Sequence, residues 1–91
     1  MRDIILDGGK VDNKDQLHAV LKEALQLPDY YGNNLDALWD CLTGWVEMPL
    51  MIRWLHFQES EEKLGEYSQL LLQLFRDAEE EIEGFHLQLE S

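Results

Sequence analysis

The stretch that decides the fold is LMIRWLHF, residues 50–57. It is apolar at nearly every position and too short for a typical helix, so it predicts a β-strand. Strands that are apolar throughout are typical of parallel sheets, and we expect this strand to be covered on both faces. Parallel neighbours are joined by long crossover connections, so helices should separate this strand from the others in the sheet.

The residues on the N-terminal side provide one such neighbour. Ile4, Ile5 and Leu6 form a β-branched run that Asp7 and two glycines interrupt, which predicts a strand over residues 2–6.

Two helices are predicted between that strand and residue 50. Apolar residues at helical spacing predict the first over residues 14–26, with Asn13 as its N-cap. The second begins at Asn33 or Asn34 and ends near Gly44, which we expect to adopt the left-handed conformation that commonly stops a helix.

The C-terminal third repeats this arrangement. Residues 59–65 are charged and allow one or two helical turns. A helical stripe then runs from Tyr67 to the vicinity of Gly84, and alternation over residues 85–89 predicts a last strand. The order β-α-α-β-α-α-β predicts a single α/β domain over residues 1–91, with a three-stranded parallel sheet and about four helices.

Composition restricts the possible partners. The net charge is −12, from 19 acids against 7 Lys and Arg. Such a chain repels the phosphates of nucleic acids and anionic membranes, and it attracts basic proteins. The single cysteine allows no internal disulfide, and no apolar run has signal or membrane-spanning length. We therefore expect a cytoplasmic protein.

Residues 23–52 contain no Lys or Arg. On a helical wheel, Asp36 and Asp40 share one face, opposite Leu38. Asp36 lies in the first turn, where the helix dipole favours an acid, but Asp40 lies beyond it and is repelled by Asp36 by about 0.2–0.5 kcal/mol. Folding alone would not select Asp40, although both acids also fit an ordinary solvated helix surface.

Large aromatic residues surround these acids. Trp39 lies at the border of the acidic face, and Tyr30 and Trp45 enter from the flanking loops. Tyr and Trp beside a charge cluster are typical of interface hot spots. Core packing is the alternative: we expect it for Trp54 and leave it open for Trp39 and Trp45.

The segment YYGNNLDALWDCLTGWVE, residues 30–47, resembles the signature of the barstar family, intracellular inhibitors of barnase-type ribonucleases. A looser resemblance extends over almost the whole chain and implies the barstar fold. It also implies a partner-binding surface that contains Tyr30, Asn34, Asp36, Trp39, Asp40, Thr43, Gly44, Trp45 and Glu47, with Asp77 nearby on the late helix.

Several details follow from the resemblance. Asp40 is expected to be the chief anchor, and Asp77 is one methylene shorter than the glutamate that is familiar there. Cys41 is expected to be a small packed residue, and the Met48–Pro49 bond is expected to be cis. Asn33 and Met48 also depart from the family pattern, in positions that can tune the choice of partner.

The resemblance implies a one-to-one complex with a basic, extracellular-type ribonuclease, formed by an inhibitor that is a monomer when free and that needs no cofactor or metal. One alternative is an acidic module, such as an antitoxin or immunity protein, for a different basic partner. Another is an enzyme that uses Asp36 and Asp40 with a histidine. The three histidines argue against the enzyme, because they fall on separate elements and we expect each to lie at the surface or half-buried.

Overall fold

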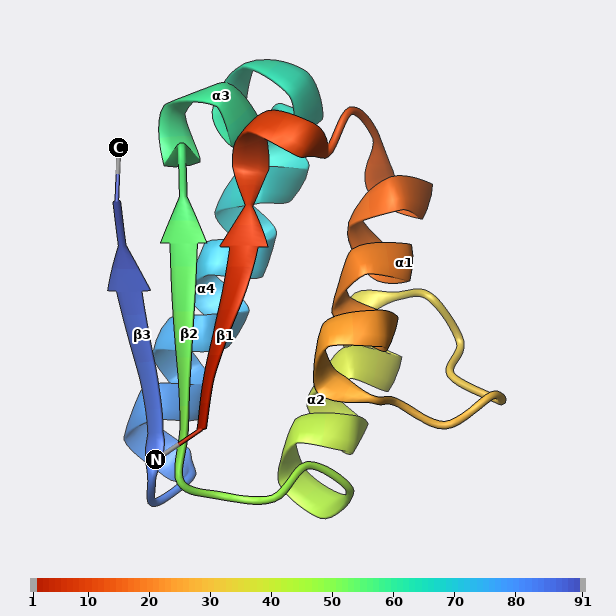
Figure 1. Ribbon diagram of the computed structural model, residues 1–91, viewed down its shortest axis with the longest axis vertical. Coiled ribbons are helices and arrows are strands. Elements are labelled where there is room, and N and C mark those ends of the chain that lie inside the picture. Colours follow the sequence, from red (N-terminus) through yellow and green to blue (C-terminus); the bar gives the residue numbers. More distant parts are fainter. Residues whose placement is uncertain (1, 91) are drawn as a thin grey trace.

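Three parallel strands form the sheet of the computed structural model, which describes residues 2–90 (Figure 1). The elements in chain order are β1 (Arg2–Asp7), a 3-10 turn (Gly8–Lys10), α1 (Lys14–Leu25), α2 (Leu35–Gly44), β2 (Leu50–Leu55), α3 (Phe57–Leu64), α4 (Glu66–Glu81) and β3 (Phe85–Leu89). The predicted order is confirmed. The charged segment after β2 forms α3, and the 3-10 turn after β1 was not predicted.

The sheet has the strand order β1-β2-β3, so β2 is its central strand. In the register of the two parallel pairs, Ile52 of β2 lies opposite Ile4 of β1 and Leu87 of β3. Leu50, Ile52 and Trp54 of β2 are fully buried, while the residues between them are only half-buried. The central strand therefore has one covered and one open face.

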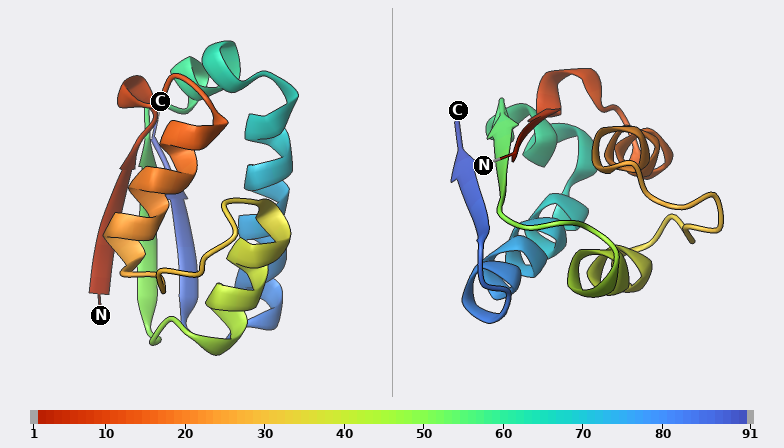
Figure 2. Two further views of the ribbon diagram at one scale, coloured as in Figure 1. Left: turned by 90° about the vertical axis from the view of Figure 1, so that its right-hand side faces the viewer. Right: turned by 60° about the horizontal axis from the view of Figure 1, so that its bottom comes forward.

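All the covering helices lie on the same side of the sheet, as Figure 2 shows for α1, α2 and α4. The expectation that both faces would be covered is wrong. Each crossover moves one strand further in the same direction, from β1 to β2 and from β2 to β3. Right-handed crossovers that progress in one direction place their helices on one face, and covering the other face requires the strand order to reverse.

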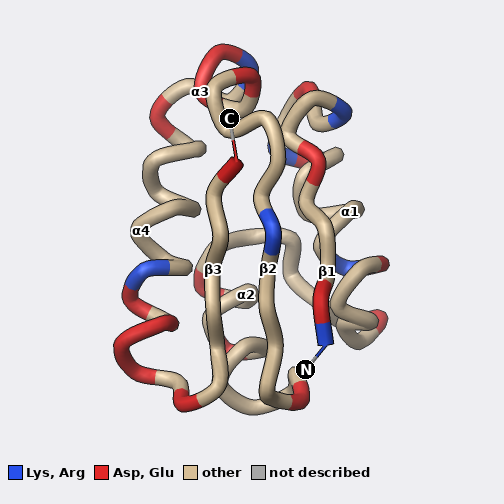
Figure 3. Tube along the Cα trace, turned by 60° about the vertical axis from the view of Figure 1, so that its left-hand side comes forward, with Lys and Arg blue, Asp and Glu red and all other residues tan. Residues whose placement is uncertain are grey.

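The uncovered face is the one that faces the viewer in Figure 3. It carries Ile5 of β1, which is 53% exposed. Arg53 of β2 donates two hydrogen bonds, from Nε and Nη2, to Glu90 Oε2 at 3.1 and 2.9 Å. The half-buried Met51 and Leu55 on this face explain why β2 is apolar at nearly every position although only one of its faces is covered.

Trp54 lies at the centre of the core, between the sheet and α4. Its ring meets those of Phe57 and Phe75 edge-on, with ring centroids 4.8 and 6.0 Å away. Its indole nitrogen donates to Ser60 Oγ at 3.0 Å, which satisfies the one polar atom of a fully buried side chain. The prediction that Trp54 is a core residue is confirmed.

The helix boundaries have local causes. Asn13 Oδ1 accepts from the backbone N–H of Gln16 and caps α1, as predicted. Asn34 Oδ1 accepts from Ala37 N at 2.8 Å and caps α2 in the same way. α1 ends at Gln26, which adopts the left-handed conformation.

Gly44 does not stop α2 in the predicted manner. It is the last helical residue, and its φ is not positive. The chain leaves the helix instead through Trp45 and Val46, whose backbone N–H groups both donate to Cys41 O, at 2.8 and 2.9 Å. The prediction of a left-handed residue at Gly44 is wrong, because the hydrogen bonds to Cys41 O already satisfy a carbonyl at the end of the helix without it. The Met48–Pro49 bond that follows is cis, as expected.

Candidate partner-binding surface

The packing of α2 determines which of its side chains reach solvent. Leu38 and Leu42 are buried against the core, and the half-buried Leu35 lies beside them. Asp36 and Asp40 consequently lie on the outer side of the helix, where both are exposed. Among residues 2–90, none of the ion pairs involves either aspartate. The predicted acidic face therefore exists as a pair of exposed carboxylates without a cation of their own.

Two aromatic side chains stand beside this face. Tyr30 is 80% exposed and Trp45 is 51% exposed, and their rings meet edge-on with centroids 6.4 Å apart. Trp45 Nε1 donates to Gln26 O at 3.1 Å, which ties the segment after α2 to the end of α1. Trp45 therefore belongs to the surface rather than to the core. Trp39 is half-buried and packs against the core with one side.

The remaining predicted residues divide into two kinds. Thr43, Gly44 and Glu47 are exposed at the C-terminal end of α2 and just beyond it. Asn34 is exposed too, but its side chain already caps α2 and also donates to Gly32 O at 3.2 Å. The side chain of Asn34 therefore acts mainly as the N-cap of α2.

A groove of about 350 Å³ separates α2 from α4. Its apolar lining comes from Leu35, Trp39, Leu70 and Leu74, and its polar lining from Asp36, Gln73, Asp77 and Glu81. Asp77 thus lines the same groove as Asp36, and its Oδ1 accepts from Gln73 Nε2 at 2.9 Å. The groove brings the late-helix acid and the acidic face of α2 to one surface.

Leu70, Gln73 and Glu81 were not predicted to belong to this surface. Leu70 is 49% exposed, which is unusual for a leucine in a small domain. The signal that identifies them is the spacing along α4. Leu70, Asp77 and Glu81 recur at intervals that place them on one helix face, together with Gln73 and Leu74.

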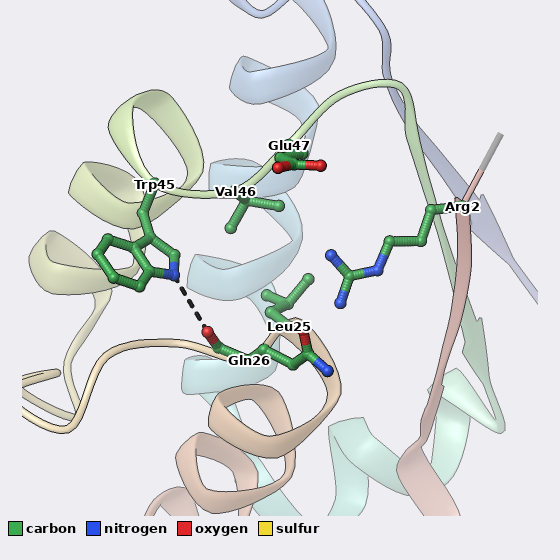
Figure 4. Close-up of a pocket in the computed structure, with 6 residues that line it drawn as sticks. All are labelled: Arg2, Leu25, Gln26, Trp45, Val46 and Glu47. Carbon is green, nitrogen blue, oxygen red and sulfur yellow. Dashed lines mark hydrogen bonds between the residues drawn. The ribbon is translucent and has the colours of Figure 1, made fainter.

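A second hollow, of about 380 Å³, lies where Glu47 approaches the start of β1. Figure 4 shows the side chain of Arg2 reaching into it from β1, with Glu47 and Trp45 on other sides. Arg2 Nη2 donates to Ala24 O at 3.2 Å, near the C-terminal end of α1, where the helix dipole favours a cation. Arg2 therefore stabilises the C-terminal end of α1, which lies beside the candidate surface, and is not itself a candidate binding residue.

His18 contradicts the expectation that all three histidines lie at the surface or half-buried. It is 1% exposed, and its Nδ1 and Nε2 lie 2.6 Å from Tyr31 Oη and 2.7 Å from Tyr67 Oη. Burial lowers the pKa of His18 below its usual value of 6.5, which favours the neutral ring. His18 shares the buried face of α1 with Leu17, Leu21 and Leu25, a spacing that the sequence shows. Its two hydrogen-bond partners come from distant parts of the chain, so no local pattern indicates that a polar ring can be satisfied there. His56 and His86 are exposed, as expected.

Cys41 is a buried free thiol, in agreement with its expected role as a small packed residue. Within residues 2–90 no group of three or more His, Cys, Asp or Glu side chains is arranged to hold a metal ion. Over the same residues, no helix combines the length and the apolar character needed to cross a membrane.

The chain thus forms a small, acidic α/β domain with exposed carboxylates on the outer side of α2. The chain matches the family model described as Barstar (barnase inhibitor) over residues 1–90, and it belongs to the barstar family. It is 50% identical, over 82 residues that cover 90% of each chain, to a protein of Bacillus subtilis (strain 168) named "Putative ribonuclease inhibitor YrdF". The predicted family is thereby confirmed, and membership places the chain among inhibitor proteins rather than enzymes.

Proposed function

We propose that this protein inhibits a barnase-type ribonuclease, and that the exposed face of α2 blocks the enzyme's active site by taking the place of RNA phosphates. The observation that carries the proposal is the pair Asp36 and Asp40. They are exposed on one face without an ion-pair partner among residues 2–90, beside two exposed aromatic rings. Like charges one turn apart disfavour the free helix, so a cationic partner is the natural reason for their arrangement.

The chemistry of RNA cleavage explains why such a face would inhibit. A ribonuclease stabilises a highly anionic transition state, so its active site holds a preorganised array of cationic side chains. Two carboxylates one helical turn apart are separated by about 6 Å along the axis, which is comparable to successive phosphates. Arginine can bind each carboxylate through two hydrogen bonds. We assign Asp40 the role of chief anchor and Asp36 that of its neighbour.

The residues around the two aspartates complete the proposed surface. Tyr30, Trp39 and Trp45 exclude water, which strengthens the ion pairs that they surround. Glu47 extends the negative potential beyond the helix, and Asp77 extends it across the groove to α4. Thr43 donates its hydroxyl to the carbonyls of Trp39 and Asp40, so it offers only its lone pairs to a partner.

Gly44 supports the proposal because the fold does not require a glycine there. Its φ is not positive, and a Cβ built at this position meets nothing within 4 Å. Glycine in a helix costs about 0.5–1 kcal/mol relative to alanine, so a bare backbone needs another explanation. Close approach of a partner over Gly44 provides one.

The proposed complex contains one inhibitor, a monomer when free, and one ribonuclease. The single cysteine is buried and unpaired, which suits a reducing compartment, so we propose that the inhibitor acts in the cytoplasm. A basic enzyme of the extracellular type would be the partner, held inactive inside the cell that makes it.

The experiment that tests this function titrates the purified protein into a panel of microbial ribonucleases and follows RNA cleavage. We expect complete loss of one activity at equimolar inhibitor, with faster association at low salt. Asp40→Asn should weaken inhibition by about 30-fold or more, because it leaves buried cations of the enzyme without a partner. Asp3→Asn, on exposed β1, removes the same charge and should change little.

Two results would refute the proposal. One is the absence of equimolar inhibition of any ribonuclease in the panel. The other is equal weakening by Asp40→Asn and Asp3→Asn, which would reduce the role of α2 to net charge alone.

A further inference from the structure

Three parts of the fold meet at the buried side chain of His18. The histidine belongs to α1, Tyr31 belongs to the irregular segment of residues 26–34, and Tyr67 belongs to α4. The two phenol oxygens lie 2.6 and 2.7 Å from the two ring nitrogens, and the ring centroids lie 5.7 and 5.9 Å apart. We call these three residues the Tyr31–His18–Tyr67 chain.

The segment that Tyr31 anchors is the one that presents Tyr30. Residues 26–34 contain no helix or strand, and Figure 2 shows the segment extending outward between α1 and α2. The caps Gln26 and Asn34 hold its two ends. In its middle, Tyr31 N donates to Pro28 O at 2.9 Å, and the phenol of Tyr31 reaches into the core. Without that anchor, an irregular segment of this length has many conformations to occupy.

We propose that the Tyr31–His18–Tyr67 chain positions residues 26–34 for partner binding, so that Tyr67 on α4 and His18 on α1 control the placement of Tyr30 without touching the partner. The part of this proposal that concerns recognition rests on the function proposed above. The part that concerns the order of the segment stands on the geometry alone. Both residues are positioning residues.

The hydrogen bonds of the Tyr31–His18–Tyr67 chain have a direction, and they are sensitive to the loss of a single hydroxyl group. A neutral imidazole has one N–H and one lone pair, so it donates to one tyrosine and accepts from the other. Removing either hydroxyl therefore leaves a buried polar atom of His18 without a partner, which costs more than the lost bond itself. His18 links α1 both to residues 26–34 and to α4, so the lost hydrogen bond weakens these contacts.

Burial, rather than the charged groups around the Tyr31–His18–Tyr67 chain, keeps the His18 ring neutral. Burial opposes protonation of His18, and Lys14 on α1 acts in the same sense, while Asp15 on α1 favours protonation more weakly than burial opposes it. Lys14 also stands over the Tyr67 ring, with Nζ 5.1 Å from its centroid. Burial raises the pKa of both tyrosines, and Cys41 on α2 adds to the effect at Tyr31. The two phenols therefore stay protonated and available to donate.

Hydrogen exchange in the free protein tests the positioning role. Tyr67→Phe removes one hydroxyl and keeps the ring. We expect the Tyr31 amide and the Trp45 indole N–H, which donates to Gln26 O, to exchange about 5- to 160-fold faster, the range that corresponds to about 1–3 kcal/mol for a buried polar atom left without its partner.

Ser68→Ala is the matched control. It also removes a buried hydrogen bond from α4, the one from Ser68 Oγ to Gly65 O at 2.7 Å, but this bond has no link to residues 26–34. The control should lower overall stability without selective exchange at Tyr31. His18→Gln is the conservative variant, because its amide supplies one donor and one acceptor, and it should exchange more slowly at Tyr31 than His18→Leu.

The complex gives the second measurement. We expect the Tyr67→Phe inhibitor to dissociate from the ribonuclease up to about 5- to 160-fold faster than wild type, and the Ser68→Ala inhibitor to dissociate at the wild-type rate. Unchanged exchange at Tyr31 in Tyr67→Phe overturns the inference, as does equal exchange in His18→Gln and His18→Leu. Faster exchange with no ribonuclease inhibited by the wild type supports the anchoring and overturns the proposed function.

Discussion

Gly44 offers a test in which stability and binding should change in opposite directions. It is the last residue of α2, in a conformation open to any residue, and a methyl group there meets nothing within 4 Å. Gly44→Ala should therefore stabilise the free protein by up to about 0.5–1 kcal/mol, through the lower backbone entropy of the unfolded chain. For a domain of this size, that gain raises Tm by about 2–8 °C.

The same methyl group should harm binding. If the partner approaches the backbone over Gly44, the added carbon must displace atoms in a packed interface, and overpacking of that kind costs about 1–3 kcal/mol. Since 1.4 kcal/mol is a factor of about ten, the inhibition constant should rise by about 5- to 150-fold. A variant that is more stable and yet a weaker inhibitor cannot be explained by unfolding.

Thermal denaturation of the free protein and titration of ribonuclease activity are the two assays. Gly65→Ala is the matched control, because Gly65 has a φ of +58° and lies between α3 and α4. A side chain in this backbone region is strained by about 1–3 kcal/mol, so the control should lose stability and inhibit as the wild type does. Wild-type inhibition by Gly44→Ala, or a fall in its Tm, would refute the role assigned to Gly44.

Two further predictions concern pH and the groove. His18 binds a proton less readily in the folded than in the unfolded protein, so its contribution to stability should be complete above about pH 6.5 and fall by up to about 1.4 kcal/mol per pH unit below it, down to the folded pKa. Urea unfolding of His18→Gln should lack this part of the fall, and an equal fall in that variant would contradict the prediction. Asp77→Asn should weaken inhibition by about 1.4- to 5-fold, as expected for a rim charge of about 0.2–1 kcal/mol, whereas Glu62→Gln on α3, which is exposed away from the groove, should have no effect. Stopped-flow association rates at low salt would show the difference, and equal effects would exclude the groove from the interface.

Local patterns were sufficient for the elements and for the acidic face. Asn13 and Asn34 are N-caps, the run from Leu50 is the central strand, and Asp36 and Asp40 share the outer side of α2. Each of these statements depends on spacing within one element. Periodicity decides such features because the core lies on one side of a helix or strand.

Features that depend on tertiary arrangement were missed. The sheet has an uncovered face because both crossovers progress in the same direction, and strand order cannot be read from the apolar run of β2. His18 can stay on the buried face of α1 because Tyr31 and Tyr67 reach its two ring nitrogens from distant segments. Leu70 joins the groove only because α4 packs beside α2. In each case the deciding neighbour is remote in the chain.

The uncovered side of the sheet also gives the molecule a natural point of attachment. Gln88 of β3 is exposed and lies opposite Arg53 in the register of β2 and β3, so it belongs to the uncovered face of the sheet. Figure 3 shows α2 on the other side of the sheet. Cys41 is buried, so a cysteine introduced as Gln88→Cys would be the accessible thiol among residues 2–90. A protein coupled to a sensor chip or a fluorophore through that position would keep α2 turned toward solution, which makes the three-stranded sheet a ready handle for capturing ribonucleases in a fixed orientation.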